Sequence, residues 1–158
     1  MIEVSGGTEK QRELVQSIAE WCAVKLMGQR LADVVNVEIE LRRDMGNSLG
    51  NATWEDDNHR PREFSMEVNA SKELRLRKIL ETVAHEMVHV KQYAKGEMKD
   101  LISRPANIRK WQGKEIDTNL ISYWDLPWEI EAYGRECGLF VRWAEENNLA
   151  NEEWTHDV

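Results

Sequence analysis

The chain has 158 residues and a formal net charge of −8. This length predicts one domain, residues 1–158, large enough for a hydrophobic core. Its 41% hydrophobic and 32% charged content is ordinary for a globular protein. The acidic balance argues against a general affinity for nucleic acid or for anionic membranes.

Membrane and secretion signals are missing from the sequence. It contains no run of about 18 apolar residues, so no membrane-spanning helix is predicted. Residues Met1 to Thr8 lack the basic and then apolar segments of a signal peptide. Cys22 and Cys137 are the only two cysteines, and their spacing is not that of a metal-ligand pair. Two reduced thiols are typical of cytosolic proteins, so we expect a cytoplasmic protein.

The first part of the chain predicts a helix followed by a small sheet. Thr8-Glu-Lys-Gln11 has the form of a capping box, and apolar residues then recur at helical spacing to about Gln29. Apolar and polar residues alternate from Val35 to Leu41, which predicts a strand with one buried face. Asn51 to Glu55 and Phe64 to Val68 predict two further short strands. The expected sheet therefore has three strands.

Two longer helices are predicted after this sheet. The first is expected to begin at Asn69 or Ser71 and to end at Gly96. The second begins near Pro127, which suits the first turn of a helix, with Asp125 as its N-cap. A connecting segment joins the two helices.

The first of these helices carries the motif His85-Glu86-Met-Val-His89, the H-E-x-x-H pattern. On a helix the two histidines lie on one face, where two imidazoles can bind zinc at about 2.0–2.1 Å. Glu86 can then accept a proton from a water that the metal activates. A chance match on a surface helix is disfavoured, because two of the four histidines in the chain fall in this one helical segment.

A catalytic zinc site needs a third protein ligand. Glu129 and Glu131 are two residues apart on the last helix and point to nearly opposite sides, so only one can face the metal. Ala132 lies on the side of Glu129 and lets the two helices approach closely, which favours Glu129. Glu131 would then be a supporting or solvated group. His59, in a predicted turn, and His156, near the C-terminus, are the rival ligands.

His85-Glu86-Met-Val-His89 followed by Glu129-Ile-Glu-Ala132 resembles the gluzincin branch of zinc metallopeptidases. The pattern is also similar to small metallopeptidase domains of bacteriophages and bacteria, some of them called SprT-like, over roughly residues 34–136. The resemblance implies a minimal zincin-like α+β fold, a Zn²⁺ cofactor held by His85, His89 and Glu129, and a peptide or protein substrate. Tyr133 stands where many gluzincins have an Asp that orients a zinc-bound histidine. SprT proteins use a third histidine as ligand, and this chain has no convincing one.

The expected mechanism follows from this set of residues. Glu86 takes a proton from the activated water and passes it to the leaving amine. Tyr133 and Tyr123 are the candidates to stabilise the oxyanion. Phe64 to Val68 is the candidate edge strand for pairing with an extended peptide. A protease of DNA-bound proteins and a non-catalytic metal-binding or regulatory module remain as alternatives; the net charge disfavours the first, and the intact Glu86 disfavours the second.

Two compositional features are open to two interpretations each. Trp111, Trp124 and Trp128 precede Glu129, and Trp143 and Trp154 are expected on the last helix. We predict that these tryptophans pack the core, with an aromatic-lined substrate cleft as the alternative. The basic stretch from Arg104 to Lys114 is predicted to be a solvated loop, with binding of an acidic peptide or a nucleic acid backbone as the alternative.

Overall fold

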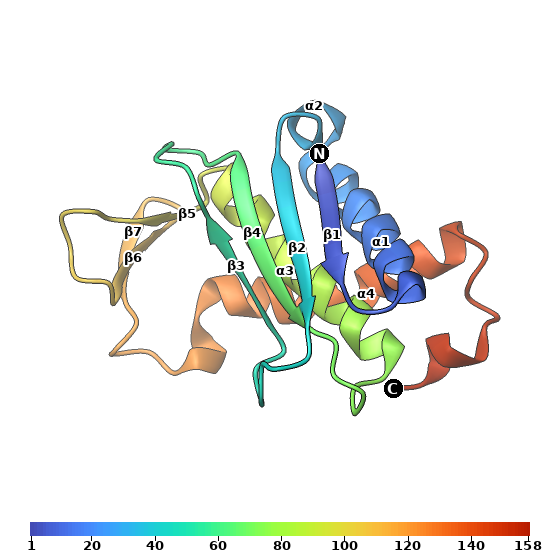
Figure 1. The fold of residues 1–158 in the computed structure, drawn as a ribbon. Coiled ribbons are helices and arrows are strands. Elements are labelled where there is room, and N and C mark those ends of the chain that lie inside the picture. Colours follow the sequence, from blue (N-terminus) through green and yellow to red (C-terminus); the bar gives the residue numbers. More distant parts are fainter.

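The computed structural model describes residues 1–158 as two β-sheets with helices on one side of the larger sheet (Figure 1). The predicted α+β class is confirmed. In chain order the elements are β1 (Ile2–Gly6), α1 (Glu9–Met27), α2 (Gln29–Ala32), β2 (Asn36–Arg42), β3 (Gly50–Trp54), β4 (Glu63–Asn69), α3 (Leu76–Ala94), β5 (Met98–Asp100), β6 (Ile108–Trp111), β7 (Lys114–Asp117), the 3₁₀ helix η1 (Tyr123–Asp125), α4 (Pro127–Glu146) and the 3₁₀ helix η2 (Glu153–His156).

The larger sheet has four strands in the order β1-β2-β4-β3, so the prediction of three strands was wrong. The strand that was not predicted is β1. Its few alternating apolar and polar residues, Ile2 to Ser5, form a strand by pairing in parallel with β2. β2 also pairs in parallel with β4, and β3 folds back antiparallel onto the outside of β4. Phe64 to Val68 is therefore an inner strand, not the predicted edge. The edge beside the motif helix is β3.

The helices cover one face of this sheet in two layers. α1 and α3 pack against the sheet and against each other, and α4 packs on the far side of α3 (Figure 1). The predicted capping box opens α1, because the Thr8 side chain accepts from the Gln11 backbone and the Gln11 side chain accepts from the Thr8 backbone. The side chains of β2 and β4 that face the helices are buried and join one hydrophobic cluster with those of the helices.

The motif helix begins later than the sequence predicted, at Leu76 rather than at Asn69 or Ser71. Asn69 ends β4, where its amide donates to the carbonyls of Gly46 and Ser48 and its Oδ1 accepts from the Ser71 backbone. The side chain thus closes a turn, which is a competing use for a residue that also favours helix starts. The predicted end is close to the observed one, because α3 ends at Ala94 just before Gly96.

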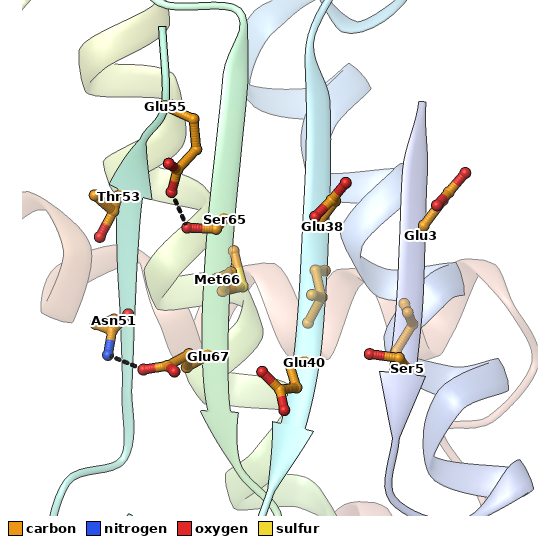
Figure 2. Close-up of a pocket in the computed structure, with 12 residues that line it drawn as sticks. Glu3, Ser5, Glu38, Glu40, Asn51, Thr53, Glu55, Ser65, Met66 and Glu67 are labelled. Carbon is orange, nitrogen blue, oxygen red and sulfur yellow. Dashed lines mark hydrogen bonds between the residues drawn. The ribbon is translucent and has the colours of Figure 1, made fainter.

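The outer face of the sheet is mostly polar where Figure 2 shows it, with Glu3, Glu38, Glu40 and Glu67 on three neighbouring strands. The register places Glu3 directly opposite Glu38, and like charges in that position repel each other. The register also places Glu40 opposite Glu67, where Arg42 pairs with Glu67. Such a face favours solvent over a nucleic acid backbone.

A second sheet, β5-β6-β7, lies beside the β3 end of the molecule and was not predicted (Figure 1). It contains most of the basic stretch from Arg104 to Lys114. Arg104 pairs with Glu115 at 3.2 Å, and Arg109 lies 3.6 Å from Asp100, so part of the positive charge is neutralised within the sheet. Among all these elements, no helix has both the length and the apolar character needed to cross a membrane.

Candidate metal centre

The predicted ligands meet where α3 packs against α4. His85 and His89 lie one helical turn apart on α3, and Glu129 lies in the first turn of α4. Ala132 is fully buried between the helices, as the sequence argument required, and its small side chain permits the close approach. The three ligand side chains are buried, and no other group of three His, Cys, Asp or Glu side chains brings its donor atoms together in this way.

The distances between the donor atoms fit a single small ion. The Nε2 atoms of His85 and His89 are 3.2 Å apart. Glu129 places Oε2 3.3 Å from His85 Nε2 and Oε1 3.5 Å from His89 Nε2. Ligand atoms about 2.0–2.1 Å from a tetrahedral ion are roughly 3.3 Å from one another. Glu129 Oε2 is also buried without a hydrogen-bond partner, a costly condition that a metal ion would relieve.

Each histidine has its other ring nitrogen held by α3 or α4. His85 Nδ1 lies 2.8 Å from Glu136 Oε2, and His89 Nδ1 lies 2.8 Å from Gln92 Oε1. Gln92 is fully buried, and its amide nitrogen donates to the Trp128 carbonyl and to Glu131, so its oxygen must accept from His89. In its neutral, metal-binding form each imidazole therefore carries its proton on Nδ1 and presents an Nε2 lone pair to the site.

Glu131 points away from the ligands, as predicted, but it is a supporting group rather than a solvated one. Its carboxylate accepts from Gln92 at 2.9 Å and from Lys91 at 2.7 Å. Lys91 is buried and also pairs with Glu97 at 2.7 Å, just before β5. Glu131 thus fixes the glutamine that orients His89.

The cluster is strongly polarised. Burial by itself would lower the pKa of His85, but the carboxylates of Glu129 and Glu136 raise it to about 9. The pKa of His89 is raised in the same way, against burial, by Glu129 and Glu86. Burial would raise the pKa of Glu129, yet the two histidines hold it well below its ordinary range. A carboxylate that stays ionised beside two imidazoles is suited to bind a cation.

Glu86 lies beside the cluster under the edge strand. Burial raises the pKa of its carboxyl group, with His89 and His85 acting in the opposite direction. Gly50 of β3 passes close over it, because a Cβ at this position would lie 3.3 Å from Glu86 Cγ and 2.9 Å from Thr82 Cγ2. A glycine here lets the free edge of β3 approach the motif helix closely.

Tyr123 and Tyr133 both reach the site, from η1 and α4. The Tyr133 ring packs edge-on against His85, with 4.6 Å between the ring centroids, and its hydroxyl lies 3.4 Å from that of Tyr123. Burial and the neighbouring Tyr133 and Glu129 raise the pKa of Tyr123, so its hydroxyl keeps its proton. Asp125 is not the N-cap of α4: it ends η1, and Leu126 holds the cap position.

The rival ligands stay outside the cluster. His59 is exposed in the loop between β3 and β4, and His156 is exposed on η2. Tyr133 makes no hydrogen bond to a ligand histidine; Glu136 orients His85 instead. Sequence reasoning missed both orienting residues, although helical spacing held a signal for them. Glu136 is two turns after Glu129, and Gln92 is one turn after His89, so each shares a face with a ligand.

Comparison of the chain with protein-family models, with curated proteins and with solved structures found no match. The functional assignment therefore rests on the chemistry of the cluster itself.

The raised pKa of His85 predicts how metal affinity depends on pH. Its folded-state pKa of about 9 exceeds the ordinary 6.5, so a metal must displace a proton at every pH below about 9. The affinity for Zn²⁺ should rise by about tenfold per pH unit for each proton displaced, from pH 6 to beyond pH 8. Competition with a chelator at each pH measures this. An affinity that levels off above pH 7 would indicate ordinary histidines and contradict the prediction.

Glu136 is expected to act through His85. Glu136→Ala should weaken metal affinity by about 10–100-fold, because His85 loses the group that fixes its tautomer and orientation. Glu136→Gln keeps an acceptor and should restore most of the affinity. The matched control is Glu145→Gln, an exposed position on the same helix. Equal affinities for Glu136→Ala and the control, measured by isothermal titration calorimetry, would exclude this role.

Proposed function

We propose that this chain is a zinc-dependent metallopeptidase that hydrolyses peptide bonds, with Glu86 as its general base. The observation that carries the proposal is the convergence of two imidazole nitrogens, from His85 and His89, and the two carboxylate oxygens of Glu129, at separations of 3.2–3.5 Å. A structural metal site needs only ligands. Here the buried carboxyl group of Glu86 lies next to the ligands, and the outer edge of β3 is unpaired. Both features favour a catalytic metal site.

Zinc is the metal that suits this donor set. Two imidazoles and one carboxylate are typical ligands of catalytic zinc, which keeps a fourth position open. Harder cations such as Mg²⁺ and Ca²⁺ prefer sites built from oxygen ligands. When bound, zinc lowers the pKa of a water molecule towards about 7 and polarises a substrate carbonyl.

Glu86 moves the proton in the proposed reaction. Burial raises the pKa of its carboxyl group, and a base whose pKa is nearer the working pH can both accept and return a proton. Glu86 accepts the proton of the attacking water and delivers it to the nitrogen of the leaving amine. Its position directly after His85 places it at the cluster without making it a ligand.

Tyr123 and Tyr133 supply hydroxyl donors next to His85. Their hydroxyls lie 3.4 Å apart, and Tyr123 stays protonated beside Glu129. We assign to them the stabilisation of the oxyanion that forms on the substrate carbonyl. Both tyrosines therefore keep the role that the sequence suggested for them.

The peptide substrate is expected to bind along β3. This strand pairs with β4 on one side only, so its other edge offers free backbone donors and acceptors. An extended peptide that adds to such an edge is held through its backbone, which orients the scissile bond. Gly50 brings this edge close to Glu86, so a peptide paired here would pass the proposed base.

Replacement of the general base tests the proposal. Glu86→Gln should bind zinc with the wild-type stoichiometry yet cleave labelled casein about 10²–10⁴-fold more slowly, because only the proton acceptor is lost. Glu145→Gln is the matched control and should retain wild-type cleavage. If zinc-loaded wild type and Glu86→Gln cleave at the same rate, or if neither cleaves any unfolded protein offered, the peptidase assignment is wrong.

A further inference from the structure

Three aromatic side chains next to the cluster are exposed to solvent. Trp124 has 67% of its surface exposed, Tyr123 48% and Tyr133 38%. Their rings contact one another, with centroid separations of 5.1 Å for Trp124 and Tyr133 and 5.5 Å for Trp124 and Tyr123. We call these three side chains the aromatic platform.

The aromatic platform is not needed by the hydrophobic core. Trp128 and Trp143 are buried in the core, as the packing interpretation predicted, whereas Trp124 is not. Cationic side chains lie over the rings of other tryptophans: Lys25 and Arg142 over Trp21, Arg109 over Trp128 and Lys10 over Trp154. Trp124 is in ring contact only with the two tyrosines, so much of its surface remains free. An exposed apolar cluster of this kind is typical of a binding surface.

The aromatic platform is continuous with the candidate metal centre. Tyr133 touches His85 at 4.6 Å between ring centroids, and Trp124 in turn packs on Tyr133. The backbone that carries the platform is fixed, because Asp125 and Leu126 donate to the carbonyls of Ser122 and Tyr123 and α4 starts immediately afterwards. Rigid aromatic groups bind a partner with little loss of conformational entropy.

We propose that the aromatic platform is a substrate subsite that binds a bulky apolar or aromatic side chain beside the scissile peptide bond. This inference rests on the proposed function and adds the class of substrate to it. The occupant follows from the surface: three adjoining rings offer apolar area, and a large apolar side chain gains the most by covering it. A lysine side chain could also contact the rings, but its ammonium would lose part of its hydration.

Peptide hydroxamates that differ in one side chain test the subsite, since the hydroxamate anchors each of them to zinc. On the zinc-loaded protein, the phenylalanine and leucine compounds should bind about tenfold more tightly than the alanine compound. Trp124→Ala should remove this preference and leave the affinity for the alanine compound unchanged. The control is Ile102→Ala, an exposed apolar residue between β5 and β6, which should keep the preference.

The outcomes separate the subsite from the peptidase. Hydroxamates that bind without side-chain preference, or that prefer lysine, overturn the subsite and leave the proposed function standing. An apolar preference that depends on Trp124, in a protein that cleaves no peptide, supports the subsite and overturns the peptidase.

A second measurement does not depend on the metal. In nuclear magnetic resonance spectra, the indole N–H signal of Trp124, assigned with Trp124→Phe, should shift on addition of N-acetyl-phenylalaninamide. The alanine and lysine amides should leave it in place. If the phenylalanine compound leaves it unmoved as well, the inference is wrong even where hydroxamates fail to bind.

Discussion

The site depends on the packing of α3 against α4. Neither helix holds three ligands by itself, so the cluster forms only where the first turn of α4 packs against the histidine face of α3, and the small, buried Ala132 permits a close approach. The same contact brings Glu136 to His85 and the Trp128 carbonyl to Gln92. The packing of α3 against α4 therefore sets both the positions of the ligands and the tautomers of the imidazoles. A change in the spacing of the two helices would disturb all of these together.

Buried charge is the cost of this arrangement. The interface holds the ionised Glu129, and one of its buried oxygen atoms has no hydrogen-bond partner. A metal ion that binds only the folded chain would stabilise it, so binding of a metal here would be coupled to folding. The pairs of Lys91 with Glu131 and Glu97 extend the polar network towards the second sheet. This network links the cluster to the segment that carries β5.

Sequence reasoning found the parts of the site that local spacing determines. The interval from His85 to His89, the choice of Glu129 over Glu131 and the small residue at Ala132 all follow from helical geometry. Sequence reasoning failed where the structure depends on contacts between segments that are far apart in the chain. Strand order is set by pairing across the sheet, so β1 was missed and β4 was taken for the edge. Glu136 was missed because the orienting acid was expected at Tyr133, the position that the resemblance to gluzincins indicates.

The most direct test of the account is the metal content of the purified, zinc-loaded protein, measured by mass spectrometry for the wild type, Glu129→Ala and Glu131→Ala. The account predicts one zinc per chain in the wild type and in Glu131→Ala, and none in Glu129→Ala, because Glu129 alone of the two carboxylates faces the histidines. A wild type that takes up no zinc, or a Glu129→Ala variant that retains it, would contradict the central claim that His85, His89 and Glu129 hold a metal ion.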